Sequence, residues 1–177
     1  MPIQFQRGDA TDPTSSGIQV ISHVVNTEGG WGAGFVLAVS RRWKAPEREY
    51  RKWHQKGQTF NPDGEITNFK LGHIQMVQVE HSVYVCNMLA QKGYGPKGKN
   101  QHRSPEDEDS YVPLQYDALE ACLTKLADQA RLLHATLHMP RIGCALAGGR
   151  WSLVEPILQR TLDGLSVTVY DHGPFNP

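Results

Sequence analysis

The chain has 177 residues, 39% of them hydrophobic and 20% charged, which fits one globular domain, residues 1–177, with a sizeable core. Lys plus Arg and Asp plus Glu both number 18, and zero net charge argues against broad electrostatic attraction to nucleic acid. No apolar run approaches the ~18 residues that span a bilayer. No apolar segment of signal-peptide length opens the chain, so we expect a cytoplasmic protein without membrane contact.

The three cysteines and eight histidines show no metal-binding spacing. The cysteines form no C-x-x-C pair, which argues against a disulfide framework or a cysteine zinc site and fits a reducing compartment. The histidines lack H-E-x-x-H or a comparable spacing. We therefore expect neither a metal nor a cofactor.

The first half of the chain predicts strands and helices joined by glycine-rich turns. A half-buried strand begins with the alternation of Ile3 and Phe5 and stops at Gly8-Asp9. Further on, we expect a strand covered on both faces at 17–26, a glycine-rich turn running into a helix at 29–43, a helix opened by Pro46 and capped by Gly57, a turn at 61–64, and two antiparallel strands at 73–90 that meet near His81-Ser82.

The second half begins with a segment rich in Gly, Pro and charge, about residues 93–113, which we interpret as a long mobile loop inside the domain. The elements expected after it are a helix at 113–134 with Leu119, Cys122, Leu123, Leu126, Ala130 and Leu133 on one face, a strand at 135–143, a helix at 151–162 with a capping box of Ser152 and Glu155 and with Pro156 in its tolerant first turns, and a last strand at 166–171.

This alternation of strands and helices, with one hairpin in the middle, predicts an α/β fold in which a mixed sheet lies between helical layers. Ligands of such sheets gather beyond the carboxyl ends of strands. The stretches "GDAT", "HVVNTEGGWGAG" and "IGCALAGG" all fall there.

Two of these stretches, "HVVNTEGGWGAG" and "IGCALAGG", contain small-residue loops that lead from a buried strand into a helix. We call them the first and the second loop. Small residues let a backbone approach a ligand, and successive N–H groups at a helix start attract anions. Two such loops at one sheet edge suggest a diphosphate ligand; the alternative is two tight turns whose glycines serve packing. The P-loop pattern is missing, and Leu37 stands where the third glycine of G-x-G-x-x-G belongs.

The order "GDAT", "SHVVNTEGGWGAGF", "VYVCNMLAQKG", "MPRIGCALAGGRW" and "VTVYD" resembles the macrodomains, which bind ADP-ribose. The resemblance covers about residues 3–171. Within that family it is nearest to the branch of ADP-ribose 1''-phosphate phosphatases and terminal ADP-ribose protein glycohydrolases. It implies a three-layer α/β/α sandwich on a mixed sheet of about six strands.

The resemblance also implies ligand-binding roles. Asp9 would accept a hydrogen bond from the adenine amino group, unless it is only a turn carboxylate. Tyr170 would lie against adenine, unless it packs in the core. Trp31 and Trp151 are expected to pack. The residues that would contact ADP-ribose are Asp9, Ala10, Gly32, Ala33, Gly34, Ile142, Gly143, Cys144, Ala145, Leu146, Ala147, Gly148 and Tyr170.

Three residues are candidates for catalysis near the distal ribose: His23, Asn26 and Lys92. In phosphatase-like members a histidine in the "H-x-x-N" position is implicated in catalysis, and Asn26 would bond the ribose. In glycohydrolase-type members the lysine of "LAQK" forms a covalent intermediate with the ribose, and an aspartate of the second loop completes the reaction. Here Ala147 occupies that place, so Lys92 needs another group or the route is different, such as His23 acting on a water.

The predicted function is hydrolysis that removes ADP-ribose from modified macromolecules, through an ester to Asp or Glu on protein or a link to a DNA base. The expected partners are therefore ADP-ribose and ADP-ribosylated protein or DNA, bound by a monomer. The alternatives are an ADP-ribose 1''-phosphate phosphatase and a non-catalytic reader of ADP-ribose, which the missing aspartate favours.

Overall fold

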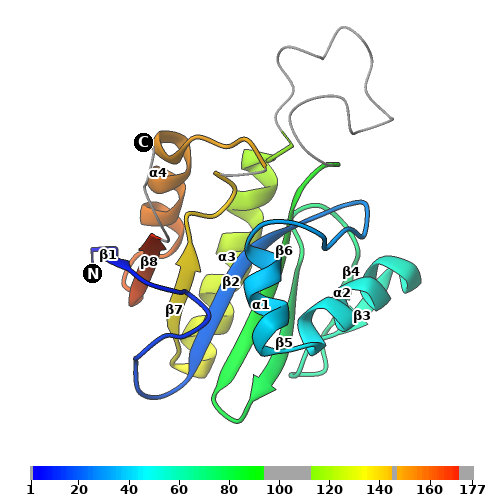
Figure 1. Ribbon diagram of the computed structural model, residues 1–177, viewed down its shortest axis with the longest axis horizontal. Coiled ribbons are helices and arrows are strands. Elements are labelled where there is room, and N and C mark those ends of the chain that lie inside the picture. The colour runs from blue at the N-terminus through cyan, green and yellow to red at the C-terminus, as the bar shows by residue number, and fades with distance from the viewer. Residues whose placement is uncertain (1, 94–112, 145–146, 172–177) are drawn as a thin grey trace, which may run out of the picture.

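The computed structural model describes residues 2–93, 113–144 and 147–171. It is a three-layer sandwich in which helices cover both faces of a six-stranded sheet (Figure 1). The elements in chain order are β1 (Gln4–Arg7), β2 (Gln19–Asn26), α1 (Phe35–Arg42), α2 (Ala45–Lys56), β3 (Gln58–Phe60), β4 (Ile66–Asn68), β5 (Ile74–Glu80), β6 (Val83–Gln91), α3 (Tyr116–Leu133), β7 (Thr136–Pro140), α4 (Trp151–Thr161) and β8 (Val167–Asp171). The predicted α/β/α sandwich is confirmed.

The strand order in the main sheet is β1-β8-β7-β2-β6-β5. Five strands run parallel, and only β5 is antiparallel to its neighbour β6, so the sheet is mixed as predicted. Parallel strands end at the same sheet edge. The segments after β1, β2, β6 and β7 therefore start from one edge, and Figure 1 shows β2, β6 and β7 running upward to it.

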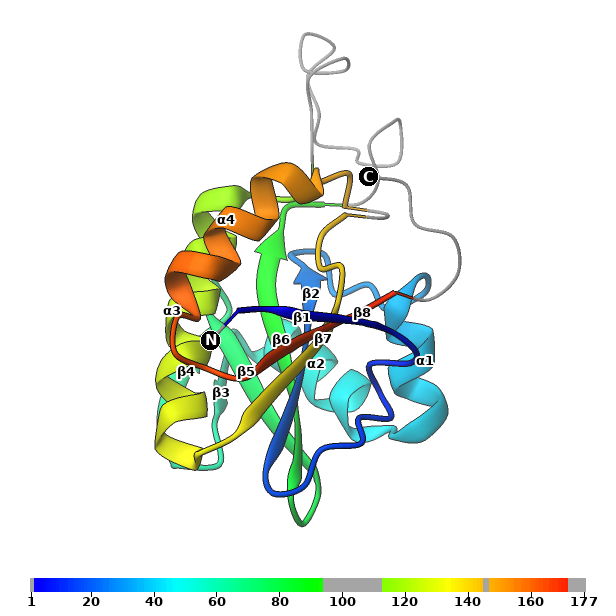
Figure 2. The same cartoon turned by 90° about the vertical axis from the view of Figure 1, so that its left-hand side faces the viewer.

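The central strand β2 divides two apolar cores. Its side chains alternate between the faces: Val20 packs toward α3 and α4, whereas Ile21 and Val25 pack toward α1 and α2. Figure 2 shows α3 and α4 on one side of the sheet and α1 on the other. Every residue of β2 except Val24 is buried, as the run of Ile and Val predicted.

The helices follow their sequence signals with one exception. Gly57 caps α2 with φ 77°, and five of the six residues predicted for the apolar face of the helix at 113–134 are buried, while Leu133 is partly buried. The capping box predicted at Ser152 and Glu155 is wrong. The N-cap of α4 is Arg150, so Ser152 already lies within the helix, and Pro156 is its sixth residue.

Two further details differ from the sequence prediction. Strand β1 is exposed along its whole length instead of half-buried, because it lies at the edge of the sheet. The turn at 61–64 joins a small antiparallel hairpin, β3 and β4, which was not predicted. Each strand has only three residues, which is too short for an alternation of apolar and polar residues to be recognised.

The segment predicted to be a mobile loop lies almost wholly outside the described residues, at 94–112. None of the described helices has both the length and the apolar character required to cross a bilayer. No cluster of three or more His, Cys, Asp or Glu side chains in the described ranges has metal-binding proximity.

Two leucines of α3 allow a test of the core that supports the sheet. Leu123 is fully buried under the sheet, and Leu132 is 67% exposed. We expect Leu123→Ala to lower the free energy of unfolding by about 2–5 kcal/mol, since it leaves a cavity. Leu132→Ala should change it by less than about 0.5 kcal/mol. Urea denaturation of both variants measures the difference, and equal losses would contradict this packing.

Candidate functional site

A cleft opens at the sheet edge where the strands end. It encloses about 580 Å³ when the space open to solvent is counted. The loop after β2 and the loop after β7 both line it, so the structure brings the two small-residue loops together. The lining residues are His23, Val24, Ala33, Gly34, Phe35, Val36, Gln91, Pro140, Arg141, Ile142, Gly143 and Ala147.

The first loop is held in place by Asn26, the last residue of β2. Its Oδ1 accepts hydrogen bonds from the backbone N–H of Glu28 (2.9 Å) and Gly30 (3.2 Å), and its Nδ2 donates to the Gly30 carbonyl (2.9 Å). The Tyr50 hydroxyl donates to the Asn26 carbonyl at 2.5 Å. Asn26 thus shapes the loop, and its predicted role as a ribose ligand stays a prediction.

The first loop ends at the start of α1, which faces the cleft. Gly34 is the N-cap with φ 82°, and no side chain caps the helix. Phe35 and Val36, the first two helical residues, line the cleft. The first N–H groups of a helix lack acceptors within it, so this end attracts anions.

The second loop contains glycines because neighbouring atoms fill the space where side chains would lie. A Cβ at Gly143 (φ 72°) would come 2.6 Å from Leu114 Cδ2, and one at Gly149 would come 2.5 Å from the Gly143 carbonyl oxygen. The Gly149 N–H donates to that carbonyl at 2.7 Å, closing the loop. Packing therefore explains Gly143 and Gly149, and a bulky residue at Gly143 is expected to strain the fold.

His23 lies beneath the first loop and lines the cleft. Its ring makes edge contacts with Trp31 (5.2 Å between centroids) and a tilted contact with Phe35 (5.8 Å). Nε2 bonds Asn87 Oδ1 at 2.6 Å, while Nδ1 is buried and has no hydrogen-bond partner in the described part of the chain. Burial lowers the pKa of His23 from 6.5 to about 4, so the ring is neutral at pH 7.

Lys92 differs from His23 in its setting. It follows β6, its side chain is exposed, and its backbone N–H donates to the Pro113 carbonyl at 2.8 Å. It does not line the cleft, although its neighbour Gln91 does. The predicted role of Lys92 in catalysis stays a prediction.

The residues expected around adenine lie at the ends of β1 and β8, outside the cleft lining. Asp9 Oδ1 accepts hydrogen bonds from the Thr11 N–H (2.8 Å) and hydroxyl (2.7 Å), which is the turn role considered above. Tyr170 is 5% exposed and its hydroxyl bonds His138 Nδ1 at 2.8 Å. Ala10 is buried beside them.

The other predicted ligand residues have mixed positions. Gly32 has open space around its Cβ position and precedes Ala33 at the cleft. Cys144 and Gly148 are half-buried outside the lining, and burial raises the pKa of the Cys144 thiol to about 11, which makes it a poor nucleophile. Ala145 and Leu146 lie outside the described residues.

Trp31 and Trp151 pack as predicted. Trp31 is buried and its Nε1 donates to Ser40 Oγ at 2.7 Å, which ties the first loop to α1. Trp151 contacts Phe5 edge-on and lies under the Arg141 guanidinium. Neither tryptophan lines the cleft.

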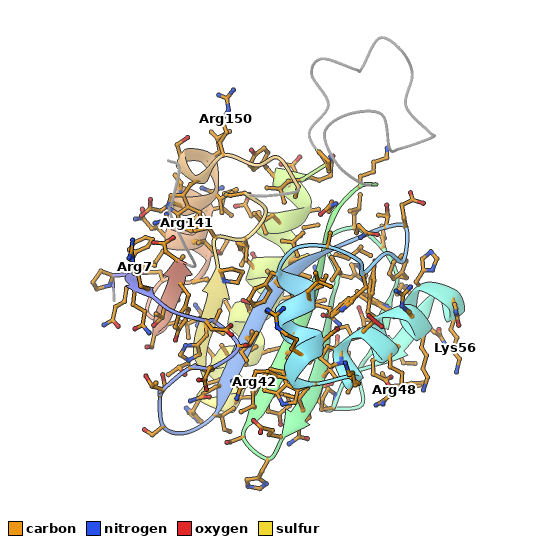
Figure 3. All side chains as sticks on the ribbon, viewed as in Figure 1. Arg7, Arg42, Arg48, Lys56, Arg141 and Arg150 are labelled. Atoms are coloured by element: carbon orange, nitrogen blue, oxygen red, sulfur yellow. The ribbon has the colours of Figure 1, made fainter. Side chains whose placement is uncertain are left out.

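Sequence reasoning missed Arg141, which lines the cleft at the end of β7 (Figure 3). Its guanidinium bonds Asp171 at 2.5 and 3.0 Å and holds the pKa of that carboxyl below its ordinary value. Cation–π contacts with Phe5 and Trp151 hold it further. The sequence signal that could have identified Arg141 was its position inside "MPRIG". The other lining residues that were not predicted carry no sequence signal beyond their adjacency to the loops: Val24, Phe35, Val36, Gln91 and Pro140.

Two buried histidines make stability depend on pH. The pKa of His23 and that of His138 are both about 4 in the folded protein because burial disfavours the charged ring, against 6.5 ordinarily. The unfolded chain therefore binds more protons between pH 6.5 and 4. The contribution of the two histidines to the free energy of unfolding is fully present above pH 6.5. Below pH 6.5 this free energy falls by about 1.4 kcal/mol per pH unit for each histidine.

We expect the free energy of unfolding in urea to fall between pH 7 and pH 5. His23→Leu should reduce that fall, because one of the two protonation events is removed. His81→Gln is the control, since His81 is exposed in the turn between β5 and β6. A stability that is equal at both pH values, or a fall unchanged in His23→Leu, would contradict the burial of neutral His23.

Comparison with known proteins gives the family. No family model matches the chain. A macrodomain protein from Streptomyces coelicolor is 44% identical, with 97% of this chain and 100% of that chain covered and a TM-score of 0.76. A protein of unknown function from Bacteroides thetaiotaomicron is 42% identical, with 97% and 98% covered and a TM-score of 0.81.

More distant similarities carry names with a function or a ligand. An ADP-ribose 1''-phosphate phosphatase from Meyerozyma guilliermondii is 23% identical over 89% of this chain and 93% of its own length. The fold also matches Thermosipho africanus DarTG, solved in complex with ADP-ribose, at 16% identity and a TM-score of 0.61, covering 90% of this chain and 40% of that one. The near-complete match to the Streptomyces protein, on the fold described above, places this chain in the macrodomain family.

Proposed function

We propose that this macrodomain binds ADP-ribose in the cleft and hydrolyses a bond at its distal ribose, releasing ADP-ribose from modified protein or DNA. The observation that carries the proposal is the meeting of both small-residue loops at one cleft, with His23 among its lining residues. The complex of DarTG with ADP-ribose supports the choice of ligand by fold.

The charge distribution around the cleft suits a diphosphate. The uncapped start of α1 presents backbone N–H groups at Phe35 and Val36 beside the cleft. On the opposite side, Arg141 lines the cleft while its guanidinium is paired with Asp171. Asp9 and Tyr170, at the ends of β1 and β8, would then lie toward adenine. His23 and Asn26 would lie toward the distal ribose.

The neutral ring of His23 suits a general base. Nδ1 would take a proton from a water, and the water oxygen would bond the anomeric carbon while the bond to the Asp or Glu ester oxygen breaks. The carboxylate leaves as an anion and needs no proton. This route uses no carboxylate at Ala147, and it leaves the exposed Lys92 outside the reaction.

The second candidate is removal of phosphate from ADP-ribose 1''-phosphate. The similarity to the Meyerozyma phosphatase over 89% of the chain favours it. His23 would again activate the water, which would then attack phosphorus and release phosphate. The products separate the two reactions, because only one yields inorganic phosphate.

The activity test compares His23→Gln with Lys92→Ala on three substrates: protein carrying ester-linked ADP-ribose, ADP-ribosylated DNA, and ADP-ribose 1''-phosphate. We expect His23→Gln to lower kcat by about 100-fold or more, the usual worth of a general base, and Lys92→Ala to retain activity. Free ADP-ribose and free phosphate are quantified. Absence of turnover on every substrate overturns the hydrolase proposal; loss of activity in Lys92→Ala alone would establish the covalent route instead.

The binding test uses Ala33→Leu, which replaces a methyl with an isobutyl group in the cleft lining at an exposed position. We expect ADP-ribose affinity, measured by calorimetry, to fall by at least about 10-fold, or 1.4 kcal/mol. His81→Leu places the same isobutyl group at the opposite sheet edge and should leave affinity unchanged. Equal affinities of Ala33→Leu and wild type would remove this cleft as the binding site.

A further inference from the structure

A row of buried polar side chains crosses three neighbouring strands beneath the cleft. Asn87 on β6 is paired in register with His23 on β2 and with Gln75 on β5. All three side chains are at most 2% exposed. Since buried polar groups are costly unless hydrogen-bonded, the bonds within this row decide the orientation of each group.

Backbone carbonyls fix the direction of these bonds, because a carbonyl oxygen only accepts. Gln75 Nε2 donates to the Glu49 carbonyl at 2.9 Å, so the Gln75 oxygen is the atom left to face Asn87. Asn87 Nδ2 donates to that oxygen at 3.0 Å and to the Pro46 carbonyl at 3.2 Å. The Asn87 oxygen is therefore the atom that faces His23.

This orientation determines where His23 carries its proton. An amide oxygen accepts and cannot donate, so the 2.6 Å bond requires a hydrogen on Nε2. A neutral imidazole has one N–H, which leaves Nδ1 with a bare lone pair. Among the residues that the structure describes, Nδ1 has no hydrogen-bond partner, and His23 lines the cleft.

We propose that Gln75 and Asn87 are positioning residues that hold His23 as its Nε2–H tautomer, so that Nδ1 is the proton-accepting atom of a ring that lines the cleft. The reaction step rests on the proposed function; the tautomer does not. A ligand group at Nδ1 must then carry a proton. Nδ1 can accept a hydrogen bond from a hydroxyl or a water. It disfavours a phosphate oxyanion, because an oxyanion has no hydrogen to donate.

The surroundings of His23 contain no competing proton donor among the described contacts. Trp31 from the first loop and Phe35 from α1 touch the ring, and neither titrates. On β6 its partner is the uncharged Asn87, and the charged side chain in the cleft lining is Arg141. The amide row therefore accounts for the state of the ring.

The test is ring ¹⁵N NMR of His23 in the free protein at pH 7, compared with three variants. Wild type should show a protonated Nε2 and an unprotonated Nδ1. Asn87→Leu, of similar volume, removes the acceptor and should lose the Nε2–H preference. Phe35→Leu is the matched control, because it changes a ring contact of His23 without touching the hydrogen bond, and it should keep the wild-type tautomer.

Asn87→Asp keeps an acceptor at Nε2 and adds a negative charge, so it should keep the Nε2–H and raise the pKa of His23. The acid limb of its kcat profile should move to higher pH, while ADP-ribose affinity is retained. This variant also serves if Asn87→Leu fails to fold. An Nδ1–H or mixed tautomer in wild type, or an unmoved His23 titration in Asn87→Asp, overturns the proposal. The wild-type tautomer without turnover on any substrate refutes the proposed function alone.

Discussion

Parallel pairing of β2 with both β6 and β7 is the constraint from which the site follows. Because parallel strands end at one edge, the loops after β2 and β7 share a cleft although more than a hundred residues separate them. Burial of β2 on both faces holds this register, since a shift by one residue would exchange its two apolar sets between the cores. His23 faces α1 and α2 for the same reason: it is two residues from Ile21 and from Val25, which pack on that side.

The small residues of the two loops satisfy two different demands. In the second loop, Leu114 and the loop's own backbone leave no space for side chains at Gly143 and Gly149. In the first loop, Gly32 is unobstructed, and Gly34 takes a positive φ to start α1 toward the cleft. Packing and ligand approach are therefore combined, and the glycines of the second loop alone do not argue for phosphate binding.

Much of the fold was accessible from the sequence because its signals are local. The apolar run of β2, Pro46 and Gly57 at the ends of α2, and the stripe of α3 each appear within a few residues. The capping box failed because Ser152 and Glu155 match the pattern while the chain enters α4 two residues earlier, at Arg150. The order of strands and helices also predicted that His23 and the two loops lie at one edge of the sheet.

Contacts between segments that are distant in the sequence could not be predicted. The Arg141 guanidinium pairs with Asp171, which lies thirty residues further along the chain. The bond from Asn87 to His23 joins residues 64 positions apart, and no local pattern marks either amide of the row. Lys92 stood out by resemblance, yet its exposure depends on how β6 ends.

A crystal structure with ADP-ribose bound tests the proposed site most directly. We expect the diphosphate between the start of α1 and the loop after β7, with backbone N–H groups of both within about 3.2 Å of its oxygens. We also expect a hydroxyl of the distal ribose, or a water beside it, on Nδ1 of His23. A nucleotide bound elsewhere, or loops that turn their carbonyls toward the diphosphate, would contradict it.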